Sequence, residues 1–196
     1  MANTLVITGG SKGLGWAIAE KYLQNGWSVV SGSRSTRPTI EASYQDRFRQ
    51  IEMDVRDRAA HKTLVGEAIA WTGRVDCFIN NAGFSEWRPI AEIDEEFLNA
   101  ILETNLKGYF WGSQAAASIL QPGSSLINIS SLAARRGTPN NSAYVASKFG
   151  VAGLTQSLAK ELGPKGIRVN AVCPVLVRTE GLVEALKDKT SPAGGK

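Results

Sequence analysis

The sequence has very little of the residues that build metal sites and disulfides. Its 196 residues include two cysteines, one histidine and two methionines. Cys77 and Cys173 each stand alone in an apolar run without metal-ligand spacing, so we expect two buried thiols rather than a disulfide or a zinc site. His61 lies in a segment that we expect to be an outer helix, where a solvated side chain is the better interpretation than a catalytic base. The sequence therefore predicts no metal site.

Long basic blocks and long apolar stretches are also missing. The 22 basic and 18 acidic residues leave a net charge of +4, and no basic block is longer than Arg135-Arg136. This pattern does not favour binding to nucleic acid or to a membrane, and a phosphorylated small molecule suits the mild positive excess better. No segment approaches the length of a membrane span, and no apolar leader precedes the strand-like run at Leu5. We therefore expect a soluble, cytoplasmic protein.

The length and composition predict one domain with one core. A chain of 196 residues with 43% hydrophobic residues can bury a good core but is short for two ordinary domains. We therefore treat residues 1–196 as a single domain. The only linker-like composition follows Leu186, and we expect this tail to be flexible.

Short β-branched runs alternate with helical patterns along the chain. Strands are predicted at residues 4–8, 28–32, 48–53, 76–80, 125–130 and 167–173, and helices at residues 13–24, from Asp94 onward and at residues 142–162. Each parallel strand needs a crossover helix before the next. The alternation therefore predicts an α/β fold in which a doubly wound parallel sheet carries helices on both faces.

A glycine-rich turn lies between the first predicted strand and the first predicted helix. Glycines here let the backbone approach a pyrophosphate, and the N-terminus of the helix offers unpaired N–H groups to its charge. The alternative is a glycine turn without a ligand, but the position in the fold pattern favours a dinucleotide site. The candidate cofactor residues of this turn are Gly9, Ser11, Lys12, Gly13, Leu14 and Gly15.

The end of the second predicted strand carries no acidic residue. A carboxylate there would bind a ribose 2′-hydroxyl, whereas an arginine accepts a 2′-phosphate. The sequence has Ser33 and Arg34 at this point, and Lys12 adds a second cation. We therefore predict NADP(H) rather than NAD(H); the alternative is that Arg34 and Lys12 are solvated loop residues.

Tyr144 and Lys148 lie four residues apart in the last predicted helix. This spacing places both side chains on one face. There the nearby ammonium and the positive charge of a bound nicotinamide are expected to lower the pKa of the phenol from its ordinary value of about 10. The pair could form an acid–base device, or it could be a chance surface pairing.

Together these motifs resemble the short-chain dehydrogenase/reductase family. The resemblance rests on Thr8 to Gly15, Asn80-Asn81-Ala82-Gly83, Ser131, Tyr144-x-x-x-Lys148 and Arg168 to Pro174, and it covers the chain from Asn3 to about Glu180. It implies a Rossmann fold with strand order 3-2-1-4-5-6, although the family's last helix and strand are apparently absent from this chain. It also implies an NADP(H)-dependent oxidoreductase that transfers hydride between the nicotinamide and a carbonyl or secondary alcohol.

The resemblance also implies the roles of individual residues. Tyr144 would act as general acid or base, Lys148 would tune it and bind the nicotinamide ribose, and Ser131 would bind the substrate carbonyl. Ser130 is an alternative to Ser131, but strand alternation turns it to the opposite face. Asn105 would support a proton relay through the lysine, or would make only a structural hydrogen bond.

Further cofactor contacts carry over from the family pattern. These are Asp54, Val55, Asn81, Ala82, Gly83, Pro174, Val177 and Thr179. Asp54 could equally cap the next helix. Phe84 and Trp87 could wall the substrate pocket or pack in the core.

One residue departs from the family pattern, which usually has glycine after Pro174. Val175 stands there, and a β-branched residue does not readily take a positive φ. It could reshape the pocket or weaken catalysis, so the alternative to an enzyme is a catalytically weak NADP(H)-binding sensor or scaffold. An epimerase or dehydratase that retains its nucleotide is a third reading. The expected partners are a small-molecule substrate and further copies of the chain, as a homodimer or homotetramer.

Overall fold

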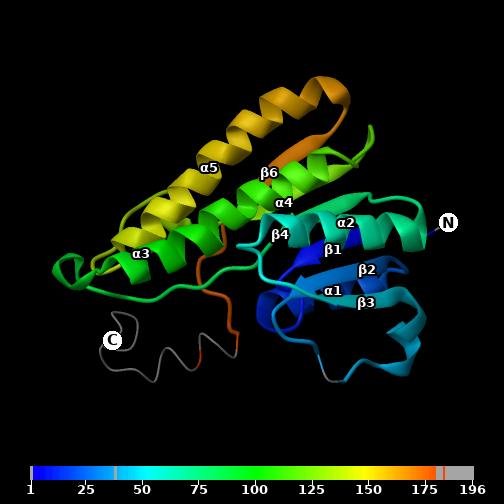
Figure 1. Cartoon of the computed structure of the whole chain (residues 1–196), viewed down its shortest axis with the longest axis horizontal. Helices are drawn as coiled ribbons and strands as arrows, with labels where there is room; N and C mark the ends of the chain where they lie inside the picture. Colours follow the sequence, from blue (N-terminus) through cyan, green and yellow to red (C-terminus); the bar gives the residue numbers. More distant parts are fainter. Residues whose placement is uncertain (1, 38, 180–182, 184–196) are drawn as a thin grey trace.

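The protein forms one six-stranded parallel sheet with helices packed against both of its faces. The structure is a computed structural model that describes residues 2–37, 39–179 and 183 (Figure 1). The strands are β1 (Thr4–Thr8), β2 (Ser28–Ser33), β3 (Phe48–Glu52), β4 (Cys77–Asn80), β5 (Ser125–Ile129) and β6 (Arg168–Val172). Their order in the sheet is β3-β2-β1-β4-β5-β6, which confirms the predicted strand order and the doubly wound Rossmann fold.

The helices divide between the two faces of the sheet. They are α1 (Gly13–Gln24), α2 (Arg58–Thr72), α3 (Glu95–Leu102), α4 (Gly108–Ala117) and α5 (Ser142–Leu162), with short helical turns η1 (Ala42–Arg47), η2 (Ile90–Glu92), η3 (Glu103–Lys107), η4 (Leu132–Ala134) and η5 (Gly163–Lys165). The buried residues of α2, α4 and α5 pack on one face, and those of α1 and η1 pack on the other. Figure 1 shows α2, α4 and α5 lying beside one another.

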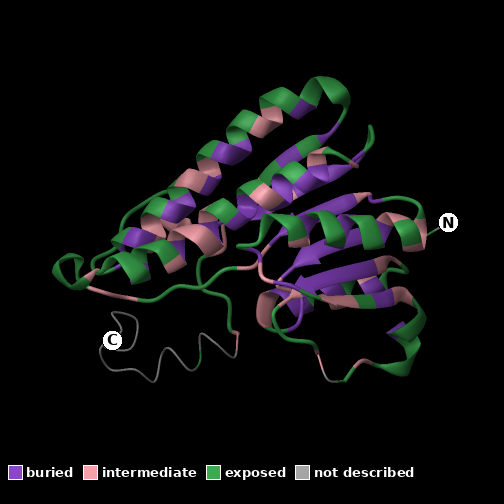
Figure 2. Cartoon of the chain, viewed as in Figure 1, coloured by how far each residue is buried: buried purple, intermediate pink, exposed green. Residues whose placement is uncertain are grey.

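The alternation of side chains along each strand builds two core layers. Val6 faces the layer under α2 and α4, while Leu5 and Ile7 face the layer under α1. Every residue of β1 is buried, as expected for a central parallel strand covered on both sides. The concentration of buried residues in the sheet is visible in Figure 2.

Most predicted elements agree with the structure to within a residue. The strand β1 and the helices α1 and α5 have the predicted bounds, and Asp94 caps α3 through the backbone N–H of Phe97. The predicted flexible tail after Leu186 lies outside the described residues.

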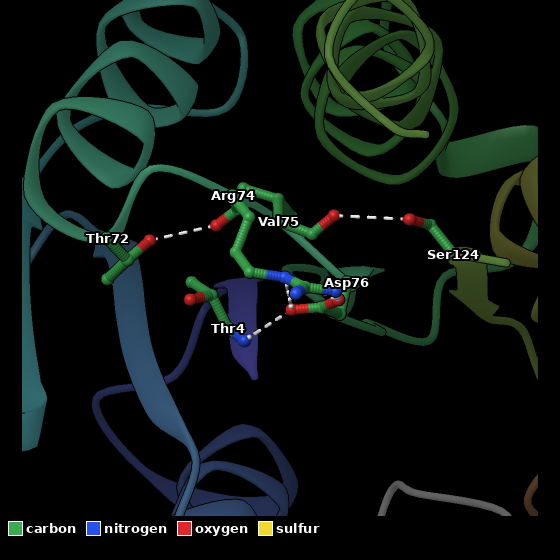
Figure 3. A network of polar contacts seen from close by, with 6 residues as sticks. All are labelled: Thr4, Thr72, Arg74, Val75, Asp76 and Ser124. Carbon is green, nitrogen blue, oxygen red and sulfur yellow. Dashed lines mark hydrogen bonds and ion pairs between the residues drawn. The ribbon is translucent and has the colours of Figure 1, made fainter. Parts of the chain in front are cut away.

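A polar network fixes the edge of the sheet where β1, β4 and β5 begin (Figure 3). The backbone N–H of Thr4 donates to Asp76 at 2.8 Å, and Arg74 forms an ion pair with the same carboxylate. The hydroxyl of Ser124 donates to the carbonyl of Val75 at 3.3 Å. These contacts tie the strands together at one edge and leave the opposite edge, where the strands end, for binding.

Candidate active site

A cavity of about 1170 Å³ opens where the strands end. In an open parallel sheet, ligands bind in this crevice because the chain winds away from it in opposite directions on its two sides. The cavity brings together every predicted site residue except Asn105. Its lining includes Gly9, Ser11, Lys12, Gly13, Leu14, Gly15, Ser33, Arg34, Asp54, Val55, Asn81, Ala82, Gly83, Ser131, Tyr144, Lys148, Pro174, Val177 and Thr179.

The glycine loop needs its glycines for two separate reasons. Gly9 has a φ of 70°, a conformation that favours glycine. A Cβ on Gly15 would overlap the carbonyl group of Gly9, so only glycine allows α1 to begin this close to the loop. Lys12 precedes α1 and makes no side-chain capping bond, and Gly13, Leu14 and Gly15 of the first turn line the cavity. This arrangement suits the negative charge of a pyrophosphate.

A cation-rich corner lies at the end of β2. The exposed Arg34 lines the cavity with Ser33 and Ser35. The nearby carboxylate of Asp54 forms an ion pair with Arg56 at 2.6 Å, and this hydrogen bonding lowers the pKa of Asp54. Because Arg56 offsets the charge of Asp54, Arg34 leaves this corner positively charged. That charge suits the 2′-phosphate of NADP(H).

Asp54 does not cap the following helix, which was the alternative reading. The side chain of Asp57 accepts a hydrogen bond from the backbone N–H of Ala59 and caps α2 instead. Asp54 is left as a residue of the cavity wall.

Asn81 holds the glycine loop against the end of β4. Its amide nitrogen donates to the carbonyls of Thr8 and Gly9 at 2.9 and 3.1 Å. The Thr8 hydroxyl in turn accepts from the backbone N–H groups of Asn81 and Ala82. The predicted dinucleotide loop and the Asn81 segment therefore form one connected wall.

Ser131, Tyr144 and Lys148 meet on the other side of the cavity. Ser131 follows β5, and hydrogen bonding to its hydroxyl favours the ionised form of Tyr144. Ser130 instead donates its hydroxyl to the backbone carbonyl of Lys148 at 3.3 Å. Ser131 therefore contacts Tyr144 and Ser130 contacts the backbone of α5, while the role of Ser131 toward a substrate stays a prediction.

Lys148 is almost completely buried and is held in one position. Its ammonium donates to the carbonyl of Ile129 at 3.0 Å and to the hydroxyl of Tyr109 at 3.4 Å. It lies 5.6 Å from the centre of the Tyr144 ring. Burial lowers the pKa of Lys148 to about 8, because the charged form loses its hydration. Tyr109 was not predicted as part of the site.

The expected lowering of the Tyr144 pKa is not produced by the protein groups alone. Burial raises the pKa of Tyr144, and only the hydrogen bond with Ser131 acts in the opposite direction. The sequence pattern located the phenol beside the ammonium but could not show how strongly both groups are desolvated. The lowering expected once a nicotinamide is bound stays a prediction.

Asn105 lies behind the cavity wall in a single π-helical turn between α3 and α4. Its amide nitrogen donates to the carbonyl of Phe84 at 2.7 Å, and its oxygen accepts from the backbone N–H of Phe84 at 3.0 Å. A Cβ on Gly83 would lie 2.9 Å from the Asn105 oxygen and 3.8 Å from the Lys148 nitrogen. Asn105 therefore positions the Gly83-Phe84 segment next to Lys148; the relay role stays a prediction.

Val175 enters the cavity wall without backbone strain. Among the described residues Asn140 alone takes a positive φ without being glycine, so Val175 does not. Its side chain is 68% exposed and lines the cavity, as do Phe84 and Trp87. Val175 thus shapes the pocket, and Phe84 and Trp87 are wall residues rather than core residues.

Two expectations for single residues are corrected. His61 is buried rather than solvated, because α2 turns it inward to contact the Val55 carbonyl at 2.8 Å. Cys77 is buried as expected, whereas Cys173 is half-buried at the end of β6. In the described part of the chain, no group of three or more candidate metal ligands occurs, and no helix is long and apolar enough to cross a membrane.

Several lining residues were not predicted from the sequence. They are Ser35, Met53, Ser85, Thr104, Ile129, Leu132, Ala133, Arg136, Thr138, Pro139, Asn141 and Leu176, with Ser130 as the rejected alternative. Most lie in loops between Ser131 and Tyr144 or just after β4. Their nearness in sequence to motif residues was the only available signal, because loop conformation decides which side chains face the cavity.

Comparisons with known proteins show what the chain as a whole is similar to. The family model described as short chain dehydrogenase matches residues 3–190. The chain is 36% identical to the L-2,3-butanediol dehydrogenase of Corynebacterium glutamicum, over all of this chain and 80% of that protein. The solved aldohexose dehydrogenase of Thermoplasma acidophilum is similar with a TM-score of 0.88 and 31% identity, over 97% of this chain and 74% of that one.

A solved structure with bound cofactor is also similar. ElxO with NADP bound gives a TM-score of 0.87 at 29% identity, over 98% of this chain and 81% of that one. The protein belongs to the short-chain dehydrogenase/reductase family of oxidoreductases, which act on alcohols and carbonyl compounds.

Proposed function

We propose that the protein is an NADP(H)-dependent oxidoreductase that reduces a small carbonyl compound or oxidises the corresponding secondary alcohol. The observation that carries this proposal is the meeting of two sets of residues in one cavity. The glycine loop forms one wall, and Ser131, Tyr144 and Lys148 form the other. Such a cavity can hold a dinucleotide and a substrate at the same time.

Each of the three residues has a distinct task at the substrate oxygen. A bound nicotinamide supplies or accepts the hydride. The Ser131 hydroxyl donates a hydrogen bond to the substrate oxygen and so fixes the carbonyl. Tyr144 donates its proton to that oxygen during reduction, and its raised pKa keeps it protonated until then.

Lys148 supplies the fixed positive charge of the site. Its bonds to Ile129 and Tyr109 hold the ammonium below the Tyr144 ring. There it stabilises the phenolate that forms as the proton leaves, and it can donate to a ribose hydroxyl. With a pKa of about 8, the ammonium is mostly charged at pH 7.

The preference for NADP(H) is proposed from the charge at the end of β2. Lys12 and Arg34 line the cavity there, and Arg56 engages the Asp54 carboxylate. The similar ElxO structure with NADP bound supports this choice. Arg34→Asp should raise the Kd for NADPH at least tenfold and improve binding of NADH, because it exchanges a cation for an anion near the 2′-phosphate. Unchanged NADPH affinity would remove Arg34 from the phosphate site.

The reaction itself is tested by NADPH oxidation in the presence of a broad panel of ketones and aldehydes. We expect carbonyl-dependent oxidation of NADPH, with retention of NADPH binding when the carbonyl is left out. Tight nucleotide binding without any carbonyl-dependent oxidation would instead support the sensor or scaffold function. Bound nucleotide that is kept through turnover without net oxidation would indicate an epimerase or dehydratase.

We further propose that copies of the chain pair through α4 and α5. Phe110 on α4 and Phe149 on α5 are 50% and 48% exposed, although both are large apolar side chains. Gly153 is also exposed on α5, and a Cβ added to it would meet no atom within 4 Å, so a second copy could approach closely there. Apolar exposure of this kind marks an interface, so we expect a homodimer or a homotetramer built from such dimers.

A further inference from the structure

Three arginines belong to the loops that follow β4 and β5, and their environments differ. Arg88 is fully engaged: it forms ion pairs with Glu86 and Asp94 at 3.0 and 3.1 Å and lies over the Phe97 ring. Arg135 is exposed and does not line the cavity. Arg136 is exposed as well, but it lines the cavity, and its guanidinium makes no hydrogen bond or ion pair with any described residue.

The surroundings of Arg136 do not neutralise its charge. The part of the cavity wall that comes from the loops after β4 and β5 consists of polar, apolar and aromatic side chains, namely Phe84, Ser85, Trp87, Leu132, Ala133, Thr138 and Pro139. Among the described lining residues the acidic side chain is Asp54, which lies at the opposite end of the cavity and is paired with Arg56. A cation that lines a partly apolar cleft attracts negatively charged ligands.

Asn141 is an independent sign that this end of the cavity is built for a polar ligand. It is 6% exposed and lines the cavity three residues before Tyr144, at the start of α5. Its carboxamide makes no hydrogen bond with the described residues, and its oxygen is shielded from solvent. A buried amide without a partner is unfavourable, so such a group calls for an explanation.

The loop that carries both residues is fixed in place by its backbone. The carbonyl of Asn140 accepts from the backbone N–H of Arg88 at 2.7 Å, and the carbonyl of Asn141 accepts from Val145 at 2.9 Å. The backbone N–H of Arg136 donates to the carbonyl of Leu132 at 3.3 Å. The two free side chains therefore project from a positioned loop next to the proposed reaction centre.

Building on the proposed oxidoreductase function, we propose that Arg136 and Asn141 bind an anionic group of the substrate. A guanidinium binds a carboxylate or phosphate through two parallel hydrogen bonds, and the amide N–H of Asn141 adds another donor. The substrate class is then a carbonyl or hydroxy compound that carries a carboxylate or a phosphate ester. Arg136 sets this specificity at one end, while Ser131 and Tyr144 hold the reacting oxygen.

The test uses NADPH-loaded protein and pairs of carbonyl compounds that differ in charge. Acetoacetate is compared with its methyl ester, and dihydroxyacetone phosphate with dihydroxyacetone. Arg136→Gln should lower kcat/KM for the preferred anionic compound about tenfold to a hundredfold and change that of its neutral partner less than about threefold. Arg135→Gln, the matched control, should change neither, and Asn141→Ala should give a smaller loss confined to the anion. The pair that shows the effect distinguishes a carboxylate from a phosphate ester.

Two results would overturn the proposal. One is an equal loss of kcat/KM in Arg135→Gln and Arg136→Gln, and the other is a loss of kcat/KM in Arg136→Gln that is the same for charged and neutral compounds. A weaker NADPH affinity in Arg136→Gln without a change in substrate preference would assign Arg136 to the cofactor and would also overturn it.

A binding measurement separates this proposal from the proposed reaction. If no carbonyl oxidises NADPH, the oxidoreductase function fails, and calorimetric titration of NADP-loaded protein with acetoacetate and with inorganic phosphate still tests the anion site. Binding that Arg136→Gln abolishes and Arg135→Gln preserves would support the site. Binding that is absent, or that does not depend on Arg136, would reject it.

Discussion

His61 shows how a single buried side chain couples stability to pH. Its Nε2 lies 2.8 Å from the Val55 carbonyl, and its Nδ1 is buried without a partner among the described residues. Burial lowers the pKa of His61 below its ordinary value of about 6.5, because the imidazolium would lose its hydration. Val55 also lines the cavity, so the contact links the core under α2 to the proposed cofactor site.

We predict that His61 makes the protein more sensitive to acid. The unfolded chain binds a proton near pH 6.5 while the folded protein resists it, so the free energy of unfolding falls as pH drops below about 6.5. The contribution of one such group is at most about 1.4 kcal/mol per pH unit. Denaturant unfolding measured between pH 7.5 and 5 should show that the free energy of unfolding falls less steeply with decreasing pH in His61→Gln than in the wild type. An identical slope in the two proteins would contradict this assignment.

At the same scale of single residues, motif spacing predicted the Ser131, Tyr144 and Lys148 cluster because the family pattern fixes it. It did not predict the inward turn of His61, because burial depends on the packing of α2 against the end of β3. The burial that raises the pKa of Tyr144 was not predicted for the same reason: spacing gives the neighbours of a group but not its loss of hydration.

At the scale of elements, glycines in two helices have opposite roles. Gly112 lies in α4 where the helix crosses β4, and a Cβ there would overlap the side-chain amide of Asn80. That amide donates to Asn128 at 2.9 Å and to Ser113 at 3.1 Å. Gly66 in α2 is exposed and has open space around its Cβ position. Gly112 therefore permits a close contact between α4 and β4, whereas Gly66 is not needed for any such contact.

Gly112→Ala should therefore lower the free energy of unfolding by about 1 to 3 kcal/mol, since the added methyl displaces a buried hydrogen-bonded amide. Gly66→Ala is the matched control and should raise it by about 0.4 to 1 kcal/mol, because alanine loses less backbone freedom on folding. Chemical denaturation of the two variants gives both values. A neutral effect at Gly112 would mean that α4 can shift away from β4 without cost.

The elements also show what the sequence could and could not predict. Strand and helix bounds followed from hydrophobic alternation and end signals, because local patterns determine them directly. The π-helical turn at Glu103–Lys107 was not predicted, since its sequence carries no local signal for an extra residue in the turn. The part of the cavity wall formed by residues 132–141 was also missed. Which of these side chains face the cavity depends on long-range contacts such as the backbone hydrogen bond between Arg88 and Asn140.

At the scale of the whole molecule, we predict that the apolar surface of α4 and α5 holds the oligomer together. Phe110→Glu would place a carboxylate in that interface, which is unfavourable when buried without a partner. Sedimentation velocity or light scattering should then report a smaller assembly than the wild type. Ala70→Glu, on the exposed side of α2, is the control and should leave the mass unchanged. An assembly that survives Phe110→Glu would place the interface elsewhere.

In the proposed reaction, Tyr144 transfers a proton to a substrate held over a bound dinucleotide. The direct measurement is the rate of carbonyl-dependent NADPH oxidation by Tyr144→Phe, made at saturating NADPH with the Kd for NADPH determined on the same sample. We predict that turnover falls at least a thousandfold while the Kd changes less than about tenfold, because phenylalanine keeps the ring and removes only the proton donor. Turnover close to that of the wild type would contradict the account.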